Sequence, residues 1–144
     1  EGNNAHTHPF VSVYEAYKKS GPNVLGVEAL QGDDGCTGVK VNTADGYADY
    51  LFSATDMQAH HPSKRVSFCG GLGLIREKEG QIQLMYLGCG RSLKKGNFVL
   101  ESDHDVYAAI YMQHGVWYYS ATGPVRVKIG KETKELNEGY NQKL

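Results

Sequence analysis

The chain has 144 residues, 40% of them hydrophobic, with 15 basic and 16 acidic side chains and a formal net charge of −1. This near-neutral balance argues against a nucleic-acid partner, which would call for a strongly basic face, and no apolar run of about 18 residues is present to cross a membrane. The length corresponds to a single domain, 1–144, that is large enough to bury a core.

The first predicted element is a strand over Phe10–Tyr17, in the phrase PFVSVYEAY. Apolar and polar residues mix there in the rhythm of a strand. Because the chain opens so abruptly on this strand, we expect it to have been cut from a larger protein.

The next segments favour strands joined by tight turns. Strands are expected over Val24–Leu30, Thr37–Val41 and Tyr47–Ser53, and the Asp45–Gly46 pair between the last two predicts a hairpin. In YADYLFSA we expect Ala48, Tyr50 and Phe52 to point into the core. The longest polar connection follows, ATDMQAHHPSKR.

The rest of the chain continues the same pattern of short strands. Predicted strands cover VSFCGGLGLIRE, QIQLMYLG, FVLE, VYAAIYM, VWYYSA and VRVKI, with DHD separating the third of these from the fourth. No segment has a sustained helical period. The chain therefore predicts an all-β fold, a two-layer antiparallel β-sandwich of about ten to twelve short strands.

The three cysteines, Cys36, Cys69 and Cys89, are an odd number without a CxxC pair, which argues against a structural zinc site. We expect buried free thiols. If the protein is exported, a Cys69–Cys89 disulfide is the alternative.

Histidines supply the candidate acid–base and metal-binding groups. His6 and His8 are two apart and point the same way in a strand, so they could share a divalent metal, or lie in a solvated terminal segment. His60 and His61 in the long loop are candidates for sugar contact or acid–base chemistry, or for an ordinary surface loop.

Cationic loops and aromatic side chains are the candidate carbohydrate-binding groups. Two basic loops, with Lys64 and Arg65 in one and Arg91, Lys94 and Lys95 in the other, would form a cationic patch for an acidic polysaccharide if they lie at one end of the sandwich, although solvated turns explain the same residues. Trp117 is either a core side chain or an exposed platform for a sugar ring. We assign no catalytic residue, because the chain has no GxSxG, phosphate-binding loop or HExxH motif.

Three phrases, PFVSVYEAYKKSGPNVLGVEAL, GVKV…GYADYLFSATD and LGCGRSLKKGNFVLESD, resemble the C-terminal region of heparinase II/III-like polysaccharide lyases. These loose hydrophobic patterns cover about two thirds of the chain. The resemblance implies a β-sandwich that follows a helical toroid, in a protein that cleaves acidic polysaccharide by proton abstraction and β-elimination. It also implies that the catalytic residues lie elsewhere, since no position here matches them.

Together these observations predict a non-catalytic accessory domain of such a lyase, secreted or periplasmic in a bacterium and without a cofactor. Its expected partners are the catalytic region of the parent chain and an acidic polysaccharide. Two alternatives remain open: an independent carbohydrate-binding module, and a small metal-dependent β-barrel enzyme of the cupin type.

Overall fold

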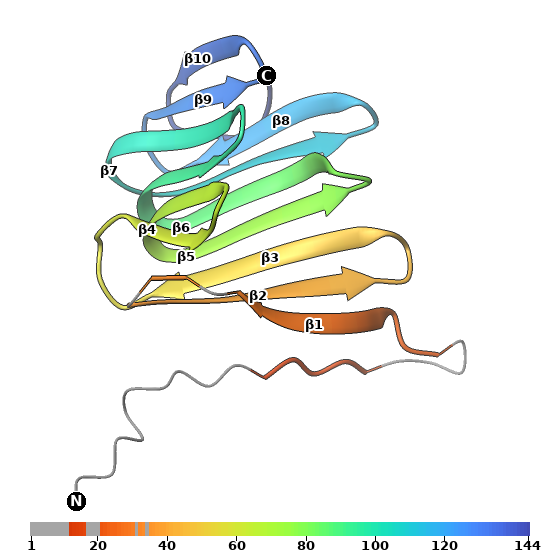
Figure 1. Cartoon of the computed structure of the whole chain (residues 1–144). Coiled ribbons are helices and arrows are strands. Elements are labelled where there is room, and N and C mark those ends of the chain that lie inside the picture. Colours follow the sequence, from red (N-terminus) through yellow and green to blue (C-terminus); the bar gives the residue numbers. More distant parts are fainter. Residues whose placement is uncertain (1–11, 17–20, 31, 34) are drawn as a thin grey trace, which may run out of the picture.

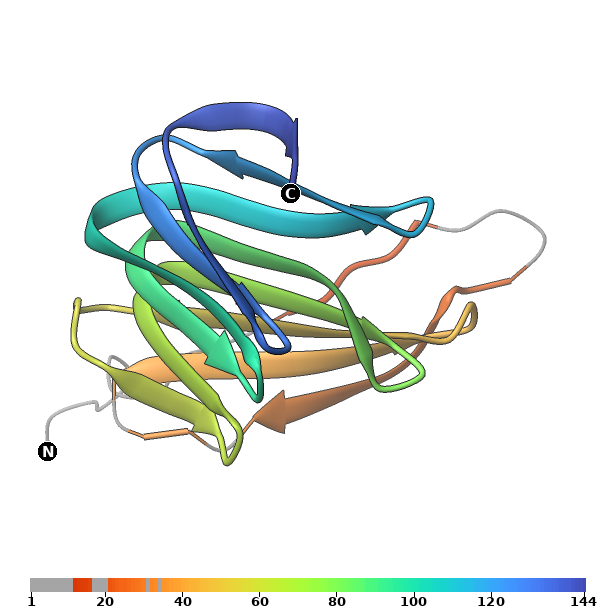
Figure 2. The same cartoon turned by 90° about the horizontal axis from the view of Figure 1, so that it is seen from above.

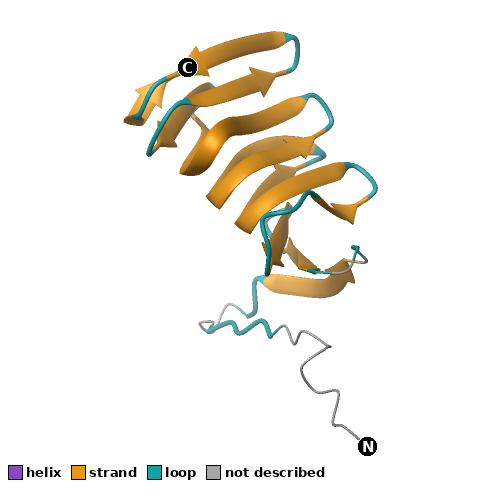
Figure 3. Cartoon of the chain, turned by 90° about the vertical axis from the view of Figure 1, so that its left-hand side faces the viewer, coloured by secondary structure: helices purple, strands orange, loops and turns teal. Residues whose placement is uncertain are grey.

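The computed structural model describes residues 12–16, 21–30, 32–33 and 35–144, and all regular structure in these residues is β (Figures 1 and 3). Eleven antiparallel strands form one hydrogen-bonded sheet, which confirms the predicted all-β class and strand number. Among the described residues there is no helix that could span a membrane. The strands are β1 Val24–Leu30, β2 Cys36–Thr43, β3 Tyr47–Ala54, β4 His60–Ser63, β5 Val66–Lys78, β6 Gln81–Lys95, β7 Phe98–Gln113, β8 Val116–Ala121, β9 Val125–Ile129, β10 Glu132–Leu136 and β11 Gly139–Lys143.

The single sheet is divided into two layers by the long strands β5, β6 and β7, each of which contributes one part to each layer (Figure 2). The first layer has the order β1-β2-β3-β5-β6-β7-β8-β11 and uses residues 72–78, 81–87 and 106–113 of the long strands. The second layer has the order β4-β5-β6-β7-β9-β10 and uses residues 66–69, 92–95 and 98–101. This arrangement is consistent with the predicted sandwich packing.

The long strands change layer at a corner that is built from glycine. The register of β5 against β6 shifts between Cys69 and Gly70, and that of β6 against β7 shifts on both sides of Gly90. A Cβ atom on Gly90 would lie 2.7 Å from the carbonyl oxygen of Cys69 and 2.8 Å from Cα of Gly70. Neighbouring backbones approach so closely at this corner that only glycine fits.

The core lies between the two layers and follows the period-two pattern of the strands. Phe52 from the first layer and Phe68 from the second are almost completely buried, with ring centroids 5.8 Å apart. Phe52 and Tyr50 confirm the predicted inward face of β3, since Phe52 is 1% exposed and Tyr50 packs against the same cluster. Met85, Leu93 and other fully buried side chains complete the core.

The strand predicted over Phe10–Tyr17 is wrong for residues 12–16, and its other residues lie outside the described part of the chain. Val13 and Tyr14 are 41% and 91% exposed, so their alternation buries no core. The Glu15 carboxylate instead accepts hydrogen bonds from the backbone N–H groups of Asn23 and Val24, at 2.7 and 3.0 Å. A local side-chain contact thus takes the place of a strand ladder.

Candidate functional site

A row of polar side chains crosses the outer surface of the second layer. The register places Ser92 of β6 opposite Glu101 of β7, Glu101 opposite Arg126 of β9, and Arg126 opposite Glu135 of β10. Residues that lie directly opposite in antiparallel strands share a face and contact each other. We call Ser92, Glu101, Arg126 and Glu135 the polar row.

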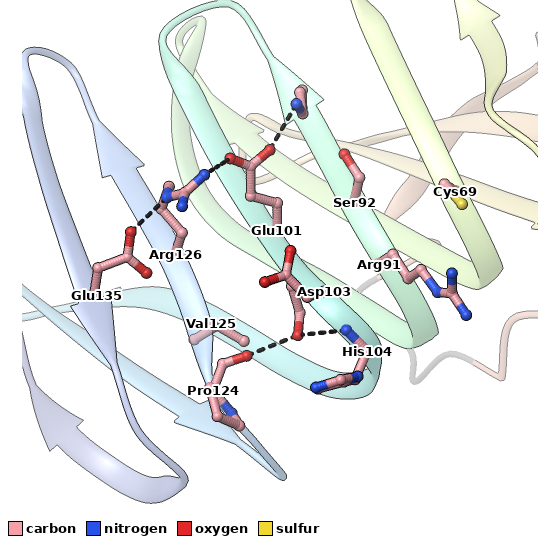
Figure 4. Close-up of a pocket in the computed structure, with 12 residues that line it drawn as sticks. Cys69, Arg91, Ser92, Glu101, Asp103, His104, Pro124, Val125, Arg126 and Glu135 are labelled. Carbon is pink, nitrogen blue, oxygen red and sulfur yellow. Dashed lines mark hydrogen bonds and ion pairs between the residues drawn. The ribbon is translucent and has the colours of Figure 1, made fainter.

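Ion pairs join Glu101, Arg126 and Glu135 of the polar row, together with Lys94, into one network (Figure 4). Glu101 accepts from Lys94 Nζ at 2.7 Å and from Arg126 Nη1 at 3.0 Å, and Arg126 Nε donates to Glu135 at 2.5 Å. The hydrogen bond from Lys94, followed by that from Arg126, holds the pKa of the Glu101 carboxyl below its usual value. The Glu135 side chain is 69% exposed, so this end of the network is open to exchange with an external anion.

Residues 102–105 of β7 lie between the residues that pair with Gly90 and Ser92, and they bulge toward the polar row. The bulge is held by Ser102 Oγ, which donates to the carbonyl of Pro124 at 2.8 Å and accepts from the N–H of His104 at 3.2 Å. Asp105 accepts from Arg91 Nε at 2.7 Å. The DHD segment is therefore part of one long strand, not the separator between two strands that its turn-like composition predicted.

The polar row and the bulge enclose an open groove of about 560 Å³, which we call the polar groove. Cations and carboxylates alternate along it, and their charges are close to balanced. Its arginine side chains, Arg91 and Arg126, have the planar donor forks that can bind a carboxylate or sulfate group. Its lining consists of Cys69, Arg91, Ser92, Lys94, Glu101, Ser102, Asp103, His104, Pro124, Val125, Arg126 and Glu135.

The predicted cationic patch is only partly brought together. Arg91 lines the polar groove, beside the glycine corner. Lys64 and Arg65 are exposed in the two-residue turn between β4 and β5, at the opposite end of the second layer, where Val66 pairs with Lys95. Neither Lys64 nor Arg65 forms an ion pair with a residue in the described part of the chain. A role of these two residues in binding stays a prediction.

Trp117 lies on the inner face of β8 and packs against Phe98, with ring centroids 5.7 Å apart. It also lines a second cavity of about 260 Å³ at the open edge between the layers, with Ile129 and Lys134. Of the two alternatives for Trp117, a core side chain describes this packing better than an exposed platform for a sugar ring. Sugar contact by Trp117 stays a prediction.

His60 and His61 begin strand β4, so the long polar connection predicted over ATDMQAHHPSKR is wrong for residues 60–63. The two side chains point apart, as expected for neighbours in an extended segment. His61 is exposed, whereas His60 is 3% exposed and its Nε2 lies 2.8 Å from the carboxylate of Asp56. Its Nδ1 has no hydrogen-bond partner among the described residues and lies 3.6 Å from the carboxylate of Asp33. His60 thus connects two loops, a structural position that its loop context did not predict.

The other candidate groups give no metal or disulfide site in the described part of the chain. No group of three or more histidine, cysteine or acidic side chains there could hold a metal ion, and His6 and His8 lie outside the described residues. All three cysteines are free; Cys89 is exposed, which is contrary to the predicted buried thiol, and Cys36 and Cys69 are half-buried. Burial raises the pKa of the Cys36 thiol to about 11.

Of the charged residues in the polar groove, the sequence predicts Arg91 and Lys94 as binding residues but does not single out Glu101, Arg126 or Glu135. The alternation in VRVKI correctly places Arg126 on an outer face. Its pairing with Glu101, 25 residues away, depends on the register of β7 against β9, and no local pattern carries that information.

Comparison with known proteins gives two matches. The sequence model of a family described as the endo-acting ulvan lyase C-terminal domain matches residues 24–112, more than half of the chain. A curated protein of Formosa agariphila, described as an endo-acting ulvan lyase, is 33% identical over 101 residues, which are 66% of this chain and 12% of that protein. The chain thus spans only a small part of that relative's length, and no solved structure matches.

Proposed function

Since this chain belongs to the family of endo-acting ulvan lyase C-terminal domains, we propose that it is a non-catalytic accessory domain of a larger polysaccharide lyase and holds acidic polysaccharide in the polar groove. The observation that carries this proposal is the polar row, which exposes an ion-paired arginine along a groove of about 560 Å³.

The chemistry of the groove supports an anionic sugar chain as the ligand. Arg126 is half exposed and donates through Nε and Nη1, which leaves its Nη2 group for a ligand carboxylate or sulfate. Arg91 uses only Nε in its ion pair with Asp105 and offers its terminal nitrogens in the same way. A ligand anion that also took the place of the exposed Glu135 at Nε would exchange one ion pair for another, at small desolvation cost.

An accessory role is supported by the state of the ionisable groups. A catalytic base or acid needs a carboxyl or imidazole with an environment that tunes its protonation. In the groove, Glu101 is held as a carboxylate by two cations, while Asp103 and His104 are exposed to solvent. The isolated chain is therefore expected to bind polysaccharide without cleaving it.

Three finer points belong to the same proposal. We propose ulvan as the polysaccharide, because the name of the Formosa agariphila protein specifies it. The hydrophobic phrases quoted above favour a heparinase II/III-like parent with a helical toroid, exported from a bacterial cell. The complete reading frame tests the parent architecture: an absence of any lyase region would contradict it.

Binding of the 144-residue chain to ulvan, followed by isothermal titration calorimetry, tests the ligand assignment. Substitution R91A or R126A should weaken binding at least about tenfold, because each removes a charged donor from the groove. The double variant K64A/R65A is the matched control, since it removes two exposed cations at the far end of the layer. No ulvan binding by the native chain, or equal losses in control and groove variants, would refute the assignment.

A further inference from the structure

We propose that the outer surface of the first layer is the docking surface through which this domain packs against the rest of the lyase chain. This inference rests on the proposed function, because it needs a parent lyase. It concerns the surface on the opposite side of the molecule from the polar groove.

The surface is built around a second cross-strand row, which is entirely apolar. The register places Ala29 of β1, Val39 of β2, Leu51 of β3, Leu74 of β5 and Tyr86 of β6 directly opposite one another. We call these five residues the apolar row. They alternate with core-facing residues such as Phe52, so their side chains lie on the face that points away from the second layer. Val39 is covered by its neighbours on this face and is 7% exposed, whereas the other four are exposed or half-buried.

Large apolar side chains on either side of the row are substantially exposed. Val27, Leu72 and Tyr107 are 49%, 45% and 53% exposed. The registers place Val27 opposite Val41 and Leu72 opposite Gly88, on the same outer face. Val41 is only 8% exposed, and its row continues into the ion pair of Asp49 and Arg76, so the patch has a charged rim on this side. Single exposed apolar residues are ordinary, but a contiguous apolar patch across five strands indicates an interaction site.

The neighbours of the row make this patch broad. Tyr86 lies over Gly88, since a Cβ atom there would be 3.0 Å from the Tyr86 ring. Tyr111 and Tyr118 stack beside it, with ring centroids 5.9 Å apart. Aromatic and aliphatic residues with few charges at the centre are the composition of a protein–protein interface core, whereas a sugar-binding groove needs more polar donors.

The rest of the lyase chain is the occupant that these observations favour. The matched relative is far longer than this chain, which covers only 12% of it, and the family match includes β1 to most of β7, the strands that form the apolar row. A covalently attached neighbour is present at a high effective concentration, so even a modest apolar surface is enough for docking. A second copy of this chain has no such tether.

Side-chain footprinting by hydroxyl radicals tests the docking surface in the intact lyase. Labelling of Leu72 and Tyr107 should fall several-fold in the intact lyase relative to the separate 144-residue chain. Met57, which is 36% exposed and whose carbonyl accepts from Cys69 Sγ at the groove side, is the internal control and should not change. Equal labelling of Leu72 and Tyr107 in both proteins would overturn the proposal.

A binding experiment in trans provides the second arm. The 144-residue chain, added to the remainder of the lyase expressed separately, should associate, and L72K or Y107K should weaken association by about tenfold or more. Circular dichroism identifies variants that fail to fold, and R91A should leave association unchanged while it weakens ulvan binding. Loss of ulvan binding with intact docking would contradict only the groove assignment. If the separate chain formed concentration-dependent dimers and L72K dissociated them, the surface would be an interface between two copies of this chain. That outcome would overturn the inference.

Discussion

The two outer surfaces of this domain carry cross-strand rows of opposite character. The apolar row runs from Ala29 to Tyr86 on the first layer, and the polar row runs from Ser92 to Glu135 on the second. Strand β6 contributes to both, with Tyr86 on one side of the glycine corner and Ser92 on the other. The buried residues of both layers belong to one hydrophobic cluster, so the core does not explain this difference.

The contrast teaches that a single strand can serve two surfaces once it is bent. Inward positions are constrained by the shared core, while outward positions are free to follow what each surface contacts. The corner at Gly70 and Gly90 separates the two surfaces. Substitutions in the core, at the corner and in the ion pairs show how much each contributes to the stability of the fold.

The largest expected effect separates the core from the apolar outer surface. Phe68 is fully buried between the layers, and Phe68→Ala should lower the free energy of unfolding by about 3–5 kcal/mol, through lost burial and a cavity. Tyr107→Ala, on the outer surface, should cost less than about 1 kcal/mol. Urea unfolding measures both. Similar losses for the two variants would contradict the assignment of Tyr107 to a surface that is not needed for folding.

The corner itself is the second test. Gly90→Ala should cost about 1–3 kcal/mol, because its methyl group would overlap Leu87 Cδ1 at 2.6 Å and the backbone of Cys69 and Gly70. Gly26→Ala in β1 is the matched control, since no atom lies within 4 Å of the position that its methyl group would take. It should change stability by no more than about 0.5 kcal/mol in the same urea titrations. A stable Gly90→Ala variant would show that the corner tolerates a wider backbone separation.

The third test compares an ion pair between the layers with those on the outer surface. Lys95 Nζ lies 2.9 Å from Glu77 and 3.6 Å from the centre of the Tyr50 ring, and the ion pair is only 14% exposed on each side. Lys95→Met should cost about 1–3 kcal/mol, since it leaves the Glu77 carboxylate unpaired. The loss should persist in high salt, because a sheltered pair is little screened. Arg126→Met should have a smaller effect that salt removes; the reverse order would refute this ranking.

Much of the hydrophobic core could be predicted from the sequence. The period-two spacing of Tyr50 and Phe52 and the Asp45–Gly46 turn are local features of the sequence, and both agree with the structure. The corner could be predicted only in part. The glycine-rich phrases CGGLG and GCG within strands predict bulges or close packing, and register shifts occur at both. That these shifts bend the strands into a second layer depends on which backbones meet there. The polar row was equally inaccessible, because Glu101 meets Arg126 through strand register.

The smallest expected effect concerns the pH dependence of the polar row. Because Lys94 and then Arg126 lower the pKa of Glu101 in the folded protein, ionised Glu101 stabilises the fold above its ordinary pKa of 4.5, and this contribution is lost as the pH falls through the lowered value. Glu101→Gln should therefore lower stability near neutral pH by at most about 1 kcal/mol, since the site is partly screened by solvent. The difference from the native chain should disappear in acid. Urea titrations at a series of pH values measure this difference in unfolding free energy. If the difference grew toward low pH, the Glu101 carboxylate would destabilise the fold. The ion pairs of the polar row would then contribute to ligand binding but not to stability.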